Sequence, residues 1–237
     1  MKKLVGLLVL ALALPLAVWA NETGPAPCPD GVSLSVYTEE GFSCTIDDKV
    51  FSDFYFESVA TEGATAVQAE NVLVTVDDTP LNPGLAFQGA WYAQEGQTND
   101  SIIQFTVTVM EGGAAIEDAS LTILGSSAVG AGSVVQVSET LCLGGLPCTN
   151  STELSVWNVP GTINDYLSDH TTFEPVMTIA VTKDILLIAG ETGGFDFAAV
   201  SLVTQNFSEV PEPATLTLFG TGLVAIGGMI RRRKKSK

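Results

Sequence analysis

The chain has 237 residues, a formal net charge of −17 and four cysteines. Of its ten basic residues, two lie in the first three positions and six in the last seven. Residues 21–210 therefore contain two lysines, no arginine and 26 acidic residues. The formal charge of this segment is 2 − 26 = −24. Such a charge repels nucleic acid phosphates and anionic lipid headgroups, so it excludes nucleic acid binding. It also favours solubility outside the cell.

The N-terminus predicts export. Lys2 and Lys3 precede an apolar run over residues 4–18, and a small residue, Ala20, closes the segment. A short positive start, an apolar stretch and a small-residue end are typical of a secretory signal peptide. We therefore predict a signal helix in residues 1–20, passage through the Sec translocon, and cleavage by signal peptidase between Ala20 and Asn21.

Residues 21–210 have the pattern of a β-domain. In residues 101–109, Ile103, Phe105, Val107 and Val109 alternate with more polar residues, which indicates a half-buried strand. Similar runs predict strands at residues 51–57, 72–76, 85–91, 119–124, 134–139, 154–157, 176–182, 185–189 and 195–203. Turns rich in Gly, Asn, Asp and Pro separate them. We predict one all-β domain over residues 21–210, an antiparallel β-sandwich that is Ig-like or jelly-roll-like.

The four cysteines all lie in this predicted domain, at Cys28, Cys44, Cys142 and Cys148. Outside the cytoplasm, an even number of cysteines suggests disulfides. Three pairings are possible, and we favour Cys28 with Cys44 and Cys142 with Cys148 because each pair closes a short loop. The spacings lack the paired CxxC of zinc sites, so we predict no metal here.

Catalytic patterns are weak. His170 is the only histidine and follows Ser168 and Asp169 directly. Neighbouring side chains diverge, so these three cannot form a catalytic triad among themselves. We predict that His170 is an exposed loop residue, that the chain has no catalytic residues and that it is not an enzyme. Two carboxylates could hydrolyse a glycoside, which leaves a small extracellular hydrolase as a lesser alternative.

Two kinds of ligand remain open. Acidic residues at predicted turns could hold structural calcium, although no EF-hand loop is present; they are Asp47, Asp48, Asp77, Asp78, Glu117, Asp118 and Asp196. Exposed aromatic rings at a sandwich edge could stack on a sugar. The candidates are Trp91, Tyr92 and Trp157, which could instead close the core.

The last 27 residues, 211–237, differ from the domain before them. The apolar run 216–230 would form a helix about 22 Å long, which is short for a bilayer core of roughly 30 Å. Arginines at its end could extend it by snorkelling. We therefore predict a transmembrane helix with its basic end in the cytoplasm and the domain outside. The basic end consists of Arg231, Arg232, Arg233, Lys234 and Lys235.

Before this helix lies a short segment with two prolines, which hold it extended and outside any sheet. It consists of Val210, Pro211, Glu212, Pro213 and Ala214. The order of proline segment, glycine-containing apolar span and basic end resembles the PEP-CTERM sorting signal. This resemblance implies recognition by an exosortase, a membrane enzyme of Gram-negative bacteria that produce extracellular polysaccharide, and cleavage near residues 211–213.

The resemblance also implies a localisation. The protein would be anchored in the inner membrane before processing and would reach the cell surface or the extracellular space afterwards, with extracellular polysaccharide as a possible partner. Our leading hypothesis is a non-enzymatic envelope or matrix protein. The alternative is a glycan- or calcium-binding adhesin that its tail keeps anchored in the membrane.

The domain itself resembles one subgroup of PEP-CTERM proteins. Cys44, Asp48-Lys49 and the run Phe51-Ser52-Asp53-Phe54 are similar to a stretch of that subgroup, except that Asp53 stands where asparagine is usual. Residues 82–87 and 207–210 are similar to it as well. This resemblance implies a shared exported domain and no biochemical activity.

Overall fold

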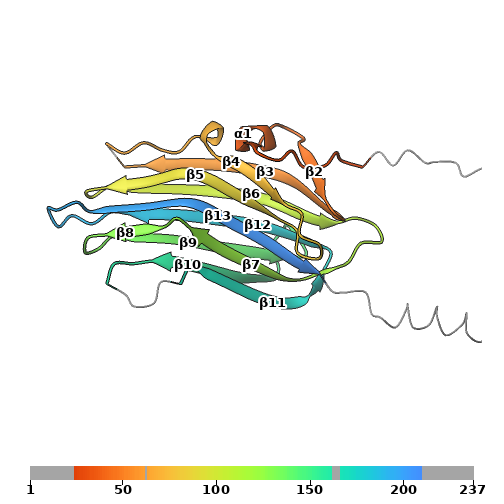
Figure 1. The fold of residues 1–237 in the computed structure, drawn as a ribbon. Helices are drawn as coiled ribbons and strands as arrows, with labels where there is room; N and C mark the ends of the chain where they lie inside the picture. The colour runs from red at the N-terminus through yellow and green to blue at the C-terminus, as the bar shows by residue number, and fades with distance from the viewer. Residues whose placement is uncertain (1–23, 62, 162–165, 210–237) are drawn as a thin grey trace, which may run out of the picture.

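The computed structural model describes residues 24–61, 63–161 and 166–209, which form two antiparallel sheets packed face to face (Figure 1). The six-stranded sheet has the order β10 (Ser151–Asn158), β9 (Val134–Leu143), β12 (Thr178–Ile188), β6 (Thr98–Val109), β3 (Lys49–Ala60), β2 (Ser43–Ile46). The seven-stranded sheet has the order β1 (Val32–Ser33), β4 (Leu73–Asp77), β5 (Gly84–Gln94), β13 (Phe197–Glu209), β7 (Ile116–Leu124), β11 (Ser168–Val176), with β8 (Ser127–Val129) also paired to β13. The predicted all-β sandwich is confirmed.

Several predictions lie outside the described residues. They are the signal helix of residues 1–20, the cleavage site between Ala20 and Asn21, and the whole of the C-terminal segment 211–237. No helix in the described part of the chain is long and apolar enough to cross a bilayer.

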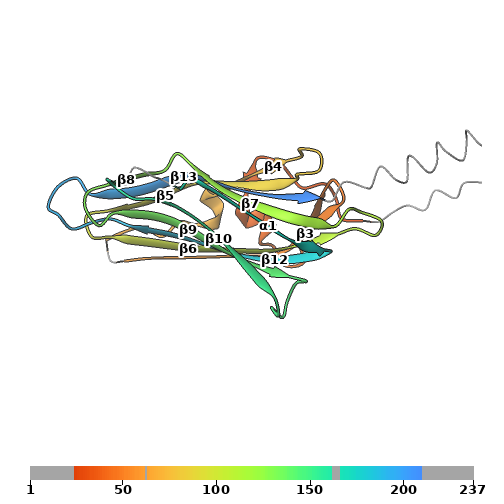
Figure 2. The same cartoon turned by 90° about the horizontal axis from the view of Figure 1, so that it is seen from below.

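The core lies between the sheets, and Phe105 is at its centre. Strand β6 buries alternate residues, as its sequence predicts, and Figure 2 shows the two layers that enclose them. The Phe105 ring lies 6.2 Å from that of Phe51 in its own sheet. It lies 6.0 Å from Phe87 and 6.4 Å from Phe207, which belong to the opposite sheet. Aromatic pairs of this kind contribute about 0.5–1.5 kcal/mol each beyond their burial, so this cluster holds the two sheets together.

The two long sides of the sandwich are closed in different ways. On one side, helix α1 (Leu34–Tyr37) and the 3-10 helix η1 (Ala69–Asn71) contact each other. Leu34 and Tyr37 are fully buried, and the Tyr37 ring packs 5.0 Å from that of Phe54 in β3. On the other side, the backbone N–H of Ser155 in β10 donates to Asp169 in β11 at 2.9 Å. A hydrogen bond thus links the edge strands of the two sheets.

One prediction about strand boundaries is wrong. The sequence predicts separate strands at residues 176–182 and 185–189. Residues 178–188 instead form the single strand β12, and Val176 is the last residue of β11. Lys183 points inward and is paired with a carboxylate, while Asp184 points outward. A charged pair can continue a strand when the inward charge is neutralised.

The strands that the sequence did not predict are short or polar. These are β1, β2, β8 and β11. Strand β11 alternates between exposed and half-buried residues at an edge of the seven-stranded sheet, so it lacks the apolar face that marks an interior strand.

Asp53 lies at an irregularity in β3. The register with β6 shifts between Ser52 and Tyr55, and Asp53 has a φ of 56°. Among residues other than glycine, asparagine and aspartate are those most often found in this left-handed region. Aspartate at position 53 therefore suits the backbone geometry of the bulge.

Candidate functional sites

The carboxyl end of β13 is held by a buried ionic cluster, which we call the Lys49 cluster and which consists of Asp48, Lys49 and Glu209. The Lys49 side chain is fully buried, and its Nζ lies 2.5 Å from Glu209 Oε1. It also contacts the Asp48 carboxylate and donates to the carbonyl oxygen of Ala114 at 3.1 Å. Glu209 is the last residue of β13, so this cluster lies where the chain leaves the sandwich toward residues 210–237.

The pKa values of the two carboxyl groups in the cluster shift in opposite directions. Burial raises the pKa of Glu209, and the hydrogen bond and charge of Lys49 offset this only in part. Burial also acts on Asp48, but hydrogen bonds from Lys49 and from the Ala114 amide outweigh it and lower its pKa. The Ala114 N–H to Asp48 Oδ2 distance is 2.6 Å. The turn before β3, the loop before β7 and the end of β13 are therefore joined around one ammonium group.

A second set of hydrogen bonds holds the same end of β13. Asn206 Nδ2 donates to Asp77 Oδ2 at 2.7 Å and to the carbonyl oxygen of Asn82 at 3.1 Å. Ser208 Oγ donates to Asn82 Oδ1 at 3.2 Å, and the Phe207 N–H donates to the Pro83 carbonyl at 2.9 Å. The loop between β4 and β5 thus covers the last residues of β13.

These contacts bring together the segments that the sequence marked by resemblance. Residues 44–54, 82–87 and 207–210 are far apart along the chain, and Lys49 and Glu209 are separated by 160 positions. In the fold, residues 44–54, 82–87 and 207–209 meet at one end of the sandwich, and Figure 1 shows β2 and the tip of the β13 arrow at that same end. These segments therefore surround the end of β13, from which the chain continues toward residues 210–237.

Only part of the acidic residues proposed for calcium lie together. In the described part of the chain, Asp47, Asp48 and Glu209 form the one group of three acidic side chains whose oxygens lie within 4.8 Å of one another. Lys49 already supplies positive charge to that group. Asp77, Asp78, Glu117, Asp118 and Asp196 belong to no such group. The carboxylates of Asp77 and Asp196 instead accept hydrogen bonds from Thr79 and Thr192.

The three aromatic candidates for sugar binding lie in different surroundings. Trp91 is 1% exposed, so it closes the core, which is one of the two readings that the sequence left open. Tyr92, its neighbour in β5, is 45% exposed because successive side chains of a strand point to opposite faces. Trp157 is half-buried and stacks on Tyr166, with ring centres 4.9 Å apart.

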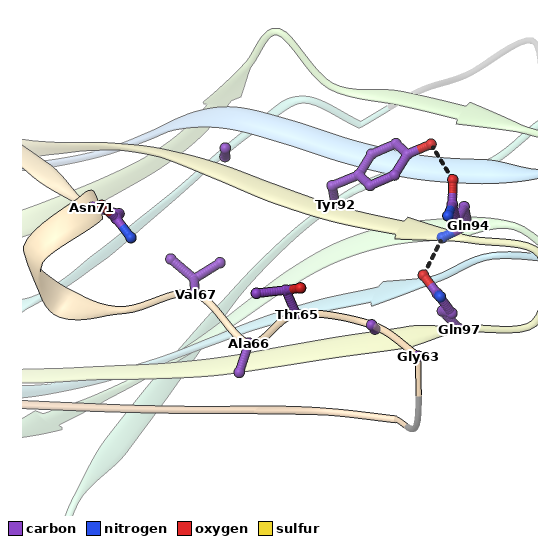
Figure 3. A pocket seen from close by; sticks show the side chains of 10 residues that line it. Gly63, Thr65, Ala66, Val67, Asn71, Tyr92, Gln94 and Gln97 are labelled. Carbon is purple, nitrogen blue, oxygen red and sulfur yellow. Dashed lines mark hydrogen bonds between the residues drawn. The ribbon is translucent and has the colours of Figure 1, made fainter.

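Two adjoining cavities flank Tyr92, and we call them together the Tyr92 groove. Their volumes are about 480 and 610 Å³, and both are lined by Asn71, Ala90 and Tyr92. Figure 3 shows the first cavity, with Tyr92 and Gln94 on β5, Gln97 in the turn after it, and residues 63–67 on the opposite side. None of the residues that line either cavity is charged.

In contrast to the uncharged Tyr92 groove, the outer face of the six-stranded sheet has a hollow lined by acidic residues. A cavity of about 530 Å³ on this face is lined in part by Glu153, Asp169 and Asp184. Burial, together with the charge and hydrogen bond of Asp100, raises the pKa of Asp184 to about 6. Carboxyl groups thus gather here as the hydrolase alternative requires, but His170 is not among the lining residues.

His170 lies on strand β11 opposite Ser120, so the predicted loop position is wrong, whereas the predicted exposure is correct. The cysteines form the two disulfides that we favoured. Cys28–Cys44 ties the N-terminal segment to β2, and Cys142–Cys148 closes the turn after β9.

The comparisons with known proteins locate the sorting signal. A family model of the PEP-CTERM protein-sorting motif matches residues 209–234, so the chain carries this motif, as predicted. The motif implies an exported protein with a C-terminal sorting tail and an exosortase partner. A search of curated proteins found no match.

Among solved structures, the chain is similar to that of TmCBM61 in complex with β-1,4-galactotriose. The identity is 9%, the match covers 65% of this chain and 88% of that one, and the TM-score is 0.31. At this TM-score the likeness supports no conclusion about the ligand of the present protein.

Proposed function

We propose that this protein is a non-enzymatic component of the bacterial envelope or extracellular matrix, which an exosortase cleaves near residues 211–213. The observation that carries the proposal is the position of the sorting motif. Its match begins at Glu209, which is also the last residue of β13. A peptidase that reads residues 211–213 therefore acts next to the folded sandwich and does not need to open it.

The proposed route has five steps. The Sec translocon exports the chain, signal peptidase cleaves between Ala20 and Asn21, and the apolar segment 216–230 holds the protein in the inner membrane. The exosortase then cleaves at the proline segment, and the sandwich passes to the cell surface or the extracellular space. During this process, basic residues 231–235 keep the C-terminal end of the tail in the cytoplasm.

A structural rather than catalytic role is supported by the environment of the titratable groups. The two described lysines are fully buried in ion pairs, so neither is free to act as a base or nucleophile. Histidine 170 is exposed on an edge strand and lies outside the carboxyl-lined cavity. A general base must lie within hydrogen-bond reach of the proton that it removes from the substrate, so these positions favour a structural role.

A second candidate function is glycan binding. The observation that favours it is the Tyr92 groove, in which an exposed aromatic ring lies among uncharged polar side chains. An aromatic ring with nearby hydrogen-bonding groups is a suitable surface for a sugar. In this version the protein is an adhesin module, either released or kept at the membrane by its tail.

We interpret the sandwich as jelly-roll-like rather than Ig-like. Counted from β5 to β13 without β8, its eight strands have the orders 1-8-3-6 and 5-4-7-2 in the two sheets. Every connection among them except β9 to β10 crosses to the other sheet. Ig sheets instead have the orders ABED and CFG, whereas jelly rolls consist of eight strands in two sheets.

The test is mass spectrometry of the mature C-terminus in cells with and without the exosortase. We expect a terminus near residues 211–213 when the enzyme is present and a peptide ending at Lys237 when it is absent. A terminus at Lys237 in both strains would contradict cleavage and would favour a permanent membrane anchor.

A further inference from the structure

We propose that the Tyr92 groove binds a neutral polysaccharide, with one sugar ring stacked on Tyr92 and its hydroxyls hydrogen-bonded to the amide side chains around it. This inference rests on the second candidate function above and specifies its site and ligand class. It is independent of the proposed cleavage by exosortase.

The groove exists because β4 is shorter than β5. Strand β4 pairs with β5 only from Gly84 to Gln88, whereas β5 continues to Gln94. Beyond Gln88, residues 63–67 lie beside this part of β5 in place of a strand, and the first cavity lies between them (Figure 3). The interruption of the sheet therefore creates a hollow at its edge.

The wall opposite β5 is held in place by hydrogen bonds. Asn99 Nδ2 donates to the Thr65 carbonyl at 3.0 Å, and the Val67 N–H donates to Ser58 Oγ at 3.2 Å. Asn99 is fully buried, so residues 65–67 are anchored to the core of the sandwich. A largely preformed hollow of this kind loses less conformational entropy when a ligand binds.

The Tyr92 ring is exposed but constrained. Its centre lies 6.2 Å from that of Phe197 on the neighbouring strand, and its hydroxyl donates to Gln94 Oε1 at 3.2 Å. The Gln94 N–H in turn donates to Gln97 Oε1 at 3.2 Å. Figure 3 shows these three side chains along one wall of the cavity. The ring therefore offers a fixed surface of 45% exposure against which a sugar can stack.

The polar groups of the groove suit hydroxyls rather than ions. Asn71, Gln88, Gln94 and Gln97 contribute amide side chains to its lining. Each amide has both donors and an acceptor, as a sugar hydroxyl does. Glycine and alanine residues fill much of the remaining lining, which leaves room for a ring to approach.

The charge distribution selects a neutral polymer. Residues 21–210 have a formal charge of −24, yet no lining residue of the groove is charged. An anionic polysaccharide would approach a strongly negative surface and would find no cation in the groove to compensate. A neutral polysaccharide avoids this repulsion.

The groove is remote from the tail exit. Tyr92 pairs with Ala199 of β13, ten residues before Glu209, which corresponds to about 33 Å along the strand. A polysaccharide in the groove and an exosortase at the tail therefore do not compete for the same surface.

Tyr55 provides a matched control. It lies on the outer face of the six-stranded sheet and is 46% exposed, which is close to the 45% exposure of Tyr92. Its hydroxyl also donates to the side chain two residues later, but that side chain is the carboxylate of Glu57 rather than an amide. Tyr55→Ala thus removes an equally exposed ring from a charged surrounding, whereas Tyr92→Ala removes one from the neutral groove.

The experiment is native affinity electrophoresis of the mature protein purified from its own host. The gels contain neutral polysaccharides (galactan, xyloglucan or dextran) or anionic ones (alginate or polygalacturonate). We expect retardation by at least one neutral polysaccharide and by neither anionic one. Tyr92→Ala should weaken the apparent affinity about tenfold, which is the order expected for loss of one stacking contact, and Tyr55→Ala should leave it unchanged.

Three results would overturn the inference: no retardation by any neutral polysaccharide, retardation by an anionic one, or equal retardation of Tyr92→Ala and the unsubstituted protein. Melting temperatures of both variants equal to that of the unsubstituted protein show that their folds are intact. The C-terminus of each variant, read by mass spectrometry, separates this inference from the sorting proposal, because Tyr92→Ala should still be cleaved.

Discussion

Lys183 and Lys49 are both fully buried in an acidic protein, but they lie in different parts of the sandwich. Lys183 is in the middle of β12, pairs with Glu139 on the neighbouring β9, and donates to Gln205 Oε1 of the opposite sheet at 2.8 Å. Lys49 lies at the start of β3, and its partner Asp48 remains 23% exposed. One cluster joins the centres of the two sheets, and the other joins the ends of strands where the tail leaves.

The difference shows how burial changes the role of an ion pair. Burial raises the pKa of Glu139 and lowers that of Lys183, and the charge of each partner opposes the shift of the other. Such a pair stabilises little in total, but the loss of one partner leaves a buried charge. At the Lys49 cluster, Asp48 is partly exposed, so water can solvate one of the two carboxylates that a substitution of Lys49 leaves behind.

The largest effect is expected from Lys183→Ala. It leaves Glu139, which is fully buried, without a counter-charge. We expect the free energy of unfolding to fall by about 3–5 kcal/mol, measured by chemical denaturation. The double variant Lys183→Met, Glu139→Leu serves as the control and should recover most of the loss. A cost below about 1 kcal/mol for the single variant would show that Glu139 becomes neutral without difficulty.

A smaller effect is expected from Lys49→Ala. Glu209 and Asp48 lose their shared ammonium, but the exposed side of Asp48 stays hydrated. We expect a loss of about 1–3 kcal/mol, together with faster limited proteolysis at the end of β13. A loss as large as that of Lys183→Ala, measured under the same conditions, would contradict the distinction between the two clusters.

The smallest effect concerns Asp184, the outward neighbour of Lys183. Its pKa is raised to about 6 from an ordinary 3.8, so between these values the folded state keeps a proton that the unfolded state has lost. Stability from this group is therefore present at low pH and is lost as the pH rises through about 6. Because the group is partly exposed and screened, the effect is about 1 kcal/mol.

Asp184→Asn removes this titration. Relative to the unsubstituted protein, the variant should gain about 1 kcal/mol between pH 4 and pH 7, measured as the difference between their unfolding free energies at each pH. A difference that is independent of pH would mean that the pKa of Asp184 is not raised in the folded state.

Local sequence patterns predicted the elements whose environment is simple. The alternation in residues 101–109 located β6, and the short loop lengths favoured the disulfide pairs that the structure contains. The same reasoning was wrong where it divided β12 at Lys183-Asp184 and where it placed His170 in a loop, and it left open whether Trp91 is exposed. In each case the deciding fact was a partner or a face supplied by a distant strand, such as Glu139 for Lys183.

The sequence by itself determined that this protein carries a sorting motif, because residues 209–234 are contiguous in the chain. It also determined the acidic charge and the all-β character, which follow from composition and from a period of two residues. Only the tertiary structure decided which of Trp91 and Tyr92 is exposed, and which acids neutralise the two lysines. It also decided that residues 44–54, 82–87 and 207–209 meet at the tail exit. These features depend on strand register and on contacts across up to 160 positions, which no local pattern encodes.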